Sequence, residues 1–271
     1  GLSKARAAQG NDVRISSALF FRLVRQEFAD RYAGSVLGIV WAVVHPMLLV
    51  SVFFAVFAQL MGARLPGIEE LHGYGVYLIA GLLPWLAFSG TIRRTTEVLH
   101  DRRDVLSKIR LPLIVPPLCV VAGETITFLV GMLVFASALV VTGYPSATGA
   151  LVLLPLIYLA HQALALGIGL LLGALNVFLK DIQEFVTAVL MVWFWATPIV
   201  WVVDIVPEQI AAAQATMNPA YWFVSAYQSI FALGEAPDAG LLLRLAVLAA
   251  LACALALAVV RLGERHIRDY L

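Results

Sequence analysis

Three residues that can exchange a proton lie within long apolar runs of the sequence: Glu124, His45 and His161. A charge at the centre of a membrane costs about 2.5 to 3.5 kcal/mol on insertion scales, so we expect Glu124 to face protein or water. Glu124 could line a path or carry a proton, or it could be held between helices. A single carboxylate without a second titratable neighbour makes a poor relay, which favours the second role.

The sequence contains none of the common catalytic motifs. It has no GxxxxGK[ST] phosphate loop, no HExxH pair, no GxSxG elbow and no paired His and Cys ligands. Cys119 and Cys253 lie inside apolar stretches, where they suit packing better than a disulfide or a metal site. We therefore expect no catalytic residue, no metal and no cofactor in this chain.

The elements that position these residues are apolar segments of membrane length. The chain is 62% hydrophobic and 13% charged, whereas soluble domains average about 45 to 50% and 25%. Windows of about 20 apolar residues, enough to cross a bilayer, fall at 36–61, 74–92, 113–142, 150–176, 185–203 and 241–262. The sequence thus predicts an all-α integral membrane protein with six transmembrane helices in a single transmembrane domain, residues 33–271.

The basic residues are sorted by loop. Sixteen of the 18 Lys and Arg residues precede the first predicted span, follow the last, or lie between spans two and three or four and five. The positive-inside rule then places both termini in the cytoplasm. No basic face for nucleic acid is expected, and the polar, arginine-bearing first 30 residues do not suggest a cleavable signal peptide.

The segment 12–32, after a flexible stretch at 1–11, predicts an amphipathic helix. Apolar side chains fall broadly on one side and arginines on another, namely Phe20, Phe21, Val24 and Phe28 against Arg14, Arg22 and Arg25. This pattern is typical of a helix at the cytoplasmic interface. A cytoplasmic helix that anchors the first span through snorkelling arginines fits equally well.

Two segments between spans also have helical patterns. From Thr96 to Pro112, opposite charges three and four residues apart predict a short solvated helix, either a docking segment or an ordinary basic inner loop. The outer segment 204–240 has no Lys or Arg and is rich in aromatic residues. With Asn218 and Pro219 as a helix start, it predicts two short interfacial or re-entrant helices, or else an aromatic belt.

Several apolar runs resemble one transporter family. YAGSVLGIVWAVVHPMLLVSVFFAVF (32–57) resembles the first span of the membrane subunits of ABC-2 type exporters for O-antigen, capsular polysaccharide and teichoic acid. The resemblance continues in family order through YLIAGLLPWLAFSGTI (77–92), LSKIRLPLIVPPL (106–118), LNVFLKDIQEFV (175–186), WFWATPIVW (193–201) and NPAYWFVSAYQ (218–228).

This resemblance implies a homodimeric permease that pairs with two copies of a separate ABC ATPase. The working unit would export a polyprenyl-diphosphate-linked glycan, most simply O-antigen, across the bacterial inner membrane. ATP and Mg²⁺ would be held by the partner subunit, which accounts for the missing phosphate loop. An ABC-2 exporter of a drug or lipid, or a polytopic membrane enzyme acting on polyprenyl-linked sugars, are the alternatives.

The resemblance also implies roles for particular residues. The main ATPase-coupling segment would hold Arg102, Arg103, Asp104 and Lys108, and the second ATPase contact would be Lys180 and Asp181. The lipid diphosphate would meet Arg22, Arg25, Arg31, Arg93 and Arg94. The family's channel is lined by the first, second and fifth spans.

Those three spans hold an excess of aromatic residues: Trp41, Phe53, Phe57, Tyr77, Trp85, Phe88, Trp193, Phe194 and Trp195. Such rings could line the channel and offer apolar faces to sugar C–H groups, or they could be core or lipid-facing. The helix pair at about 207–233 would form the outer gate, with Tyr221, Trp222 and Tyr227.

Overall fold

The computed structural model describes residues 17–31, 34–53, 55–56, 71–106, 111–144 and 148–270. Over these ranges the chain is helical and has no strand, which confirms the all-α prediction for this part of the protein. The predictions for residues 1–16, Phe57 and Lys108 lie outside the described residues.

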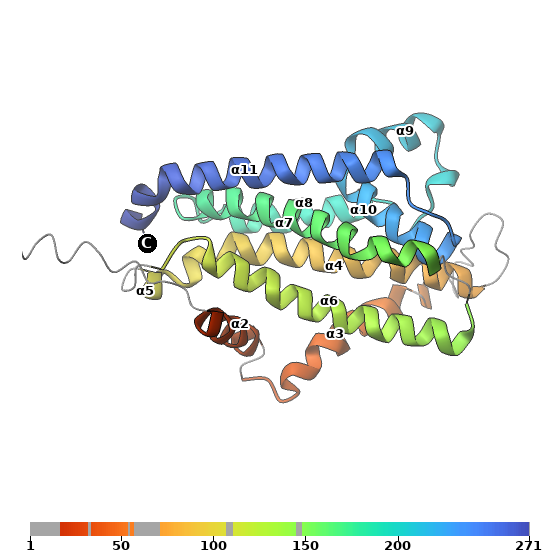
Figure 1. Cartoon of the computed structure of the whole chain (residues 1–271), viewed down its shortest axis with the longest axis horizontal. Helices are drawn as coiled ribbons and strands as arrows, with labels where there is room; N and C mark the ends of the chain where they lie inside the picture. The colour runs from red at the N-terminus through yellow and green to blue at the C-terminus, as the bar shows by residue number, and fades with distance from the viewer. Residues whose placement is uncertain are drawn as a thin grey trace, which may run out of the picture.

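Four long helices form the body of the molecule, running lengthwise beside one another (Figure 1): α4 (Leu71–Asp101), α6 (Val115–Thr142), α7 (Leu154–Asn176) and α11 (Ala239–Tyr270). Each contains a stretch long and apolar enough to cross a membrane. Helix α4 is central, because it packs against α6, α7 and α10 and most of its surface is buried. Helices α6 and α11 expose apolar faces, including Leu133 and Leu251, as expected for contact with lipid.

Two shorter apolar helices occur where the first and fifth spans are predicted. They are α3 (Trp41–Phe53), preceded by the 3₁₀ turn η1 (Gly38–Val40), and α8 (Ile182–Ala196). The prediction that the fifth span reaches residue 203 is wrong, because the helix ends at Ala196 just before Thr197 and Pro198. A proline has no N–H and restrains the residue before it, so it stops the helix. The Pro198 carbonyl instead accepts hydrogen bonds from Tyr77 and Gln228.

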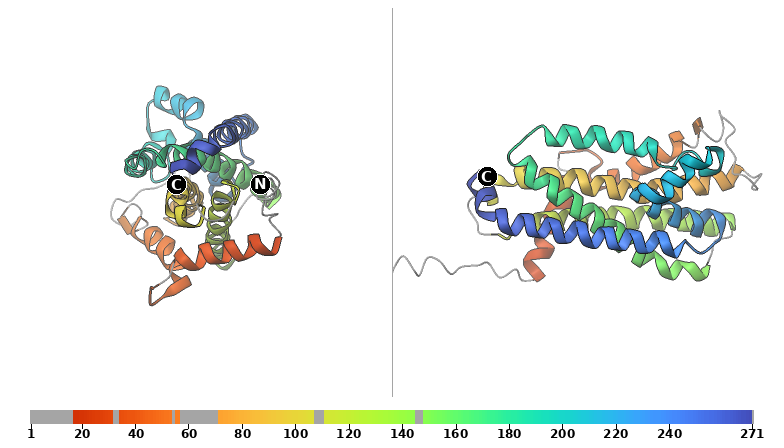
Figure 2. Two further views of the ribbon diagram at one scale, coloured as in Figure 1. Left: turned by 90° about the vertical axis from the view of Figure 1, so that its left-hand side faces the viewer. Right: turned by 90° about the horizontal axis from the view of Figure 1, so that it is seen from above.

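Helix α2 (Ser17–Arg31) lies crosswise to the long helices and packs against α6 (Figure 2). Val24 and Phe28 are buried as the apolar pattern indicates, but so is Glu27, and Phe21 is 70% exposed. Phe21 therefore does not share the buried side of α2 with Val24 and Phe28. Glu27 and Arg31 form ion pairs with the long helices, and these pairs turn that side of α2 inward.

Helix α4 continues well beyond the predicted span end at residue 92. Thr95 and Thr96 are buried against α7, so the predicted solvated helix from Thr96 is wrong over its first residues. Helix α7 approaches this part of α4 closely. A Cβ added at Gly169 would lie 2.7 Å from Thr95 Cβ, and one added at Gly173 would lie 2.8 Å from the Thr95 carbonyl oxygen. In the described part of this inner segment, the short helix α5 (Arg103–Leu106) follows α4.

The remaining elements lie at the end of the molecule opposite α5 and the C-terminal end of α11 (Figure 1). They are η3 (Thr148–Leu153), η4 (Val203–Ile205), α9 (Glu208–Met217), α10 (Pro219–Gln228) and the π-helical turn η5 (Ser229–Leu233). As the sequence indicates, the Asn218 side chain caps α10 by accepting a hydrogen bond from the Ala220 N–H, with Pro219 in the first turn. Gly234, at φ 68°, ends the turn.

Candidate functional site

A cavity of about 680 Å³ lies among α3, α4, α6 and α8, next to the C-terminal end of α2. Part of its wall is charged and the rest is apolar and aromatic. The charged and hydroxyl-bearing residues of the lining are Arg31, Ser35, Ser89, Arg93, Arg94, Glu124, Thr127 and Thr187.

The aromatic wall is formed mainly by residues from the three spans predicted to line a channel. Trp41 and Phe53 come from α3, Trp85 from α4 and Phe194 from α8. The ring centroids of Phe53 and Phe194 are 5.6 Å apart, and those of Trp85 and Phe194 are 5.9 Å apart. Phe128 of α6 also lines the cavity and was not predicted.

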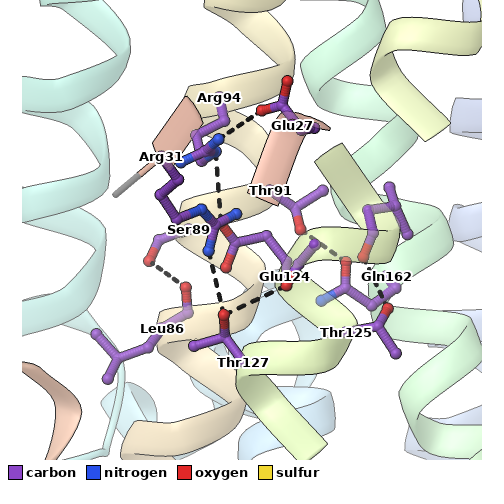
Figure 3. A network of polar contacts seen from close by, with 12 residues as sticks. Glu27, Arg31, Leu86, Ser89, Thr91, Arg94, Glu124, Thr125, Thr127 and Gln162 are labelled. Atoms are coloured by element: carbon purple, nitrogen blue, oxygen red, sulfur yellow. Dashed lines mark hydrogen bonds and ion pairs between the residues drawn. The ribbon is translucent and has the colours of Figure 1, made fainter. Parts of the chain in front are cut away.

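The charged side of the cavity is built around Glu124 of α6. Arg31 of α2 donates through Nη2 to Glu124 Oε1 over 2.7 Å and through Nη1 to Thr127 Oγ1 over 3.1 Å. Arg94 of α4 places its Nε 3.7 Å from the same Glu124 oxygen. Figure 3 shows the two guanidinium groups reaching this region from different helices.

The absence of side chains at two positions makes room for this pair. A Cβ added at Gly90 would lie 3.0 Å from Glu124 Oε2, and one at Gly123 would lie 3.3 Å from Arg31 Nη2. An arginine and a carboxylate can therefore meet between apolar helices with good hydrogen-bond geometry, which a buried charged pair requires. Glu124 is thus held between helices by Arg31, and it also lines the cavity.

Arg94 extends the network out of the cavity. It donates to Glu27 of α2, and Arg102 donates to the other Glu27 oxygen over 2.7 Å and to Asp30 over 3.0 Å. Burial raises the pKa of Glu27, but the hydrogen bonds from Arg94 and Arg102 outweigh it and leave the pKa below its ordinary value. Glu27 is thus a carboxylate at neutral pH, and it ties α2 both to α4 and to the residue that precedes α5.

The structure brings together three of the five arginines predicted to meet the lipid diphosphate. Arg31, Arg93 and Arg94 line the cavity. Arg22 and Arg25 are exposed on α2 and are not part of the cavity wall.

The residues predicted to couple to an ATPase are gathered at one end of the molecule. Arg103 and Asp104 are exposed on α5, whereas Arg102 is engaged by α2. Lys180 and Asp181 are exposed in the turn between α7 and α8, at the same end as α5 (Figure 1).

The other predicted channel aromatics lie outside the cavity wall. The Tyr77 hydroxyl donates to the Pro198 carbonyl over 3.3 Å, and Trp193 Nε1 donates to Asn218 Oδ1 over 2.8 Å. Phe88 is fully buried. Trp195 is half exposed, with its ring 6.3 Å from that of Phe53.

The three predicted gate residues hold α10 in place. Trp222 is buried and donates to the Ala215 carbonyl over 3.0 Å, while Tyr221 is half-buried. Tyr227 is 1% exposed, with its ring 6.0 Å from that of Phe128 behind the cavity wall.

Sequence reasoning missed Glu27, Asp30 and Thr127. One signal could have found Glu27: it lies three residues after Val24, on the same side of an amphipathic helix. A buried acid at that position and a membrane-embedded Glu124 each need a cation, and the arginines of the inner segments are the available partners.

The fold defines a multi-pass helical membrane protein with a cavity among its helices. The profile of the ABC-2 type transporter family matches residues 18–232, and the chain belongs to this family.

Two curated relatives show which branch of the family the chain resembles. It is similar to the O-antigen export system permease protein RfbA of Myxococcus xanthus, with 31% identity over 230 residues that cover 84% of this chain and 85% of that protein. It is also similar to the protein of the same name from Klebsiella pneumoniae, with 27% identity over 212 residues, or 78% of this chain and 79% of the relative. The family resemblance predicted from the sequence is confirmed.

Proposed function

We propose that this chain is the membrane permease subunit of an ABC exporter that moves polyprenyl-diphosphate-linked O-antigen across the bacterial inner membrane. The family and the names of its relatives support a permease. The observation that carries the proposal is the cavity, which combines three arginines with an aromatic wall.

Both parts of such a ligand have matching chemistry in this cavity. Guanidinium groups form charge-assisted, often bidentate hydrogen bonds with phosphate oxygens, so Arg31, Arg93 and Arg94 suit the diphosphate. The rings of Trp85 and Phe194 offer flat apolar surface to isoprenoid carbons or to sugar C–H faces. An arginine-free aromatic cavity would favour an uncharged drug or lipid instead.

The proposal extends to the topology. The short helices α3 and α8 would cross the membrane together with the four long helices, giving six spans. The end that contains α5 and the C-terminal part of α11 carries Arg102, Arg103 and Arg268, and the positive-inside rule places this end in the cytoplasm. Helix α2 would then lie along the inner membrane surface.

The same end of the molecule would bind the ATPase. Two copies of this chain would pair with two copies of an ABC ATPase, which binds ATP and Mg²⁺. Helix α5, with Arg103 and Asp104 exposed, would be the main docking element, and the turn at Lys180 and Asp181 the second. Movement of α5 would reach the cavity through Arg102, Glu27 and Arg94.

The test is export by the purified complex. The chain is co-purified with its candidate ATPase, the bound lipid-linked sugar is identified by mass spectrometry, and ATP-dependent glycan export is measured in proteoliposomes. Arg93→Gln should slow export because Arg93 faces the cavity, whereas Arg261→Gln, at an exposed position of α11 that is not part of the cavity wall, should not.

Two results would contradict the proposal. Export of an uncharged cargo in place of the glycan would favour a drug or lipid exporter. Chemical change of the glycan by the chain without an ATPase would indicate an enzyme.

A further inference from the structure

Two carboxylates share Arg94, but they lie on different sides of it. Glu27 receives a hydrogen bond from Arg94 Nη2 and lies outside the cavity wall. Glu124 lies 3.7 Å from Arg94 Nε and is part of the wall, where it also pairs with Arg31. An anion that enters the cavity would therefore meet the two arginines on the side where Glu124 already lies.

Glu124 is buried and well held in this position. Its side chain is 8% exposed, and that of its partner Arg31 is 10% exposed. The carboxylate presents an anionic oxygen 2.7 Å from a guanidinium nitrogen, the separation that a phosphate oxygen would adopt at the same donor. Gly90 leaves the space for this carboxylate on the facing helix.

Hydrogen-bonding capacity remains for a larger anion. Arg94 Nε is buried and makes no hydrogen bond among the described residues. The described cavity wall carries three guanidinium groups, those of Arg31, Arg93 and Arg94, against the single carboxylate of Glu124. This excess of positive charge suits a diphosphate diester, in which each phosphate carries an acidic oxygen.

We propose that the Glu124 carboxylate occupies the place beside Arg31 and Arg94 where an anionic ligand binds. A phosphate of the ligand displaces it from these two arginines on binding. This inference rests on the proposed function, and it identifies Glu124 as the residue that sets the affinity of the cavity for the diphosphate. The guanidinium groups of Arg31 and Arg94 keep an anionic partner, because one anion replaces another on the same arginines, so no buried guanidinium is left alone.

Competition of this kind suits a transporter. A site that conducts must bind its ligand well enough to load it and weakly enough to release it. When Glu124 returns to Arg31, it competes with the bound phosphate and favours release. Glu124 thus acts on the ligand through the arginines that both of them bind. Removal of its carboxylate should strengthen ligand binding instead of weakening it.

The experiment measures binding of inorganic pyrophosphate to the purified full-length chain in lipid nanodiscs by equilibrium dialysis. Glu124→Gln keeps the size of the side chain and removes its charge, and should bind pyrophosphate about fivefold or more tightly than the wild type, a typical coupling between competing sites. Glu124→Asp draws the carboxylate back from Arg31 and should give an intermediate affinity, and it serves if the Gln variant does not fold.

The matched control is Glu264→Gln, which removes a carboxylate that pairs with Arg268 on α11, outside the cavity wall, and should leave pyrophosphate binding unchanged. In the export assay, Glu124→Gln should lower both KM and kcat for the glycan, because loading becomes easier and release slower.

The outcomes separate this inference from the proposed function. If the wild type binds pyrophosphate and Arg31→Gln abolishes binding, but neither Glu124 variant binds more tightly, the inference is wrong and the diphosphate site stands. If no form of the protein binds pyrophosphate, the diphosphate site is wrong, and the inference is overturned with it.

Discussion

The two sides of this molecule are packed in different ways. Helices α4, α7 and α11 approach so closely that a Cβ added at Gly167 would lie 2.8 Å from the backbone of Ala252. Helix α8, on the cavity side, buries only Val186 and Leu190, and in α3 only Pro46 is buried among the residues whose side chains are described. Helices α4, α7 and α11 form a block that is fixed by close backbone contacts. The other side of the molecule is joined across a cavity by aromatic contacts and ion pairs.

This difference indicates which parts can move. Helices in backbone contact can shift only by large repacking, whereas ion pairs and rings around a cavity can exchange partners at lower cost. We expect α2, α3 and α8 to move against a fixed block of α4, α7 and α11. Substitutions in the two regions should therefore have effects of different kinds.

The largest effect should come from comparing two phenylalanines. Phe223 of α10 is fully buried against the block, with its ring centroid 4.9 Å from that of Phe88 of α4, whereas Phe194 lines the cavity. Phe223→Ala should lower the free energy of unfolding by about 3 to 5 kcal/mol, measured as loss of thermal stability in detergent. Phe194→Ala should change stability much less and slow export. Equal destabilisation by the two variants would contradict the distinction between block and cavity.

The next effect concerns two adjacent arginines. Arg102→Glu removes a charged hydrogen bond to the buried Glu27, worth about 1.5 to 3 kcal/mol, and one to the exposed Asp30, worth about 0 to 1 kcal/mol. It also places like charges together. It should lower thermal stability and ATPase co-purification, whereas Arg103→Glu, at an exposed position, should lower ATPase co-purification alone. Arg102→Lys, which keeps a positive charge beside Glu27 and Asp30, should retain part of the stability. If it does not, the pair does not hold α2 in place.

A smaller effect is expected within the fixed block. Gly167→Ala places a methyl group against the α11 backbone, and such overpacking typically costs about 1 to 3 kcal/mol. Thermal unfolding should detect the loss. Gly149→Ala is the matched control, because a Cβ there meets nothing within 4 Å. If Gly167→Ala left thermal stability unchanged, α7 and α11 would be able to separate easily.

The smallest effect is a pH dependence on the cavity side. The pKa of Glu27 is lowered on folding from an ordinary value of 4.5, so its contribution to stability is present above pH 4.5 and is lost as the pH falls through the lowered value. Thermal stability of the wild type should decline below pH 4.5 more steeply than that of Glu27→Gln. Parallel pH profiles of the two proteins would show that Glu27 is not responsible.

The fixed block could be predicted well from the sequence. Apolar windows located α7 and α11, and also α6 beside the block, because lipid demands long apolar segments whatever their neighbours are. The same windows ended α4 too early, because Thr95 and Thr96 look solvated until Gly169 and Gly173 bring α7 against them. Burial there depends on a contact between distant segments, which no local pattern records.

The cavity side could be predicted only in part. The family resemblance implied five arginines for an anion, and the structure places three of them, Arg31, Arg93 and Arg94, on one wall, whereas Arg22 and Arg25 lie outside it. The aromatic pattern did not distinguish Trp85, which lines the cavity, from Phe88, which is fully buried three residues later. That distinction depends on helix rotation, which packing against α8 and α10 decides.

The pairing of Arg31 with Glu124 also has a consequence for the folding of the protein during its synthesis. The two residues are 93 positions apart, so at 5 to 20 residues per second the ribosome needs on the order of 5 to 20 s to deliver the partner. During that interval α2 has no place to dock and must wait at the membrane surface. Any factor that shields α2 there, or that slows the emergence of α6, should change the yield of folded protein without altering the finished structure.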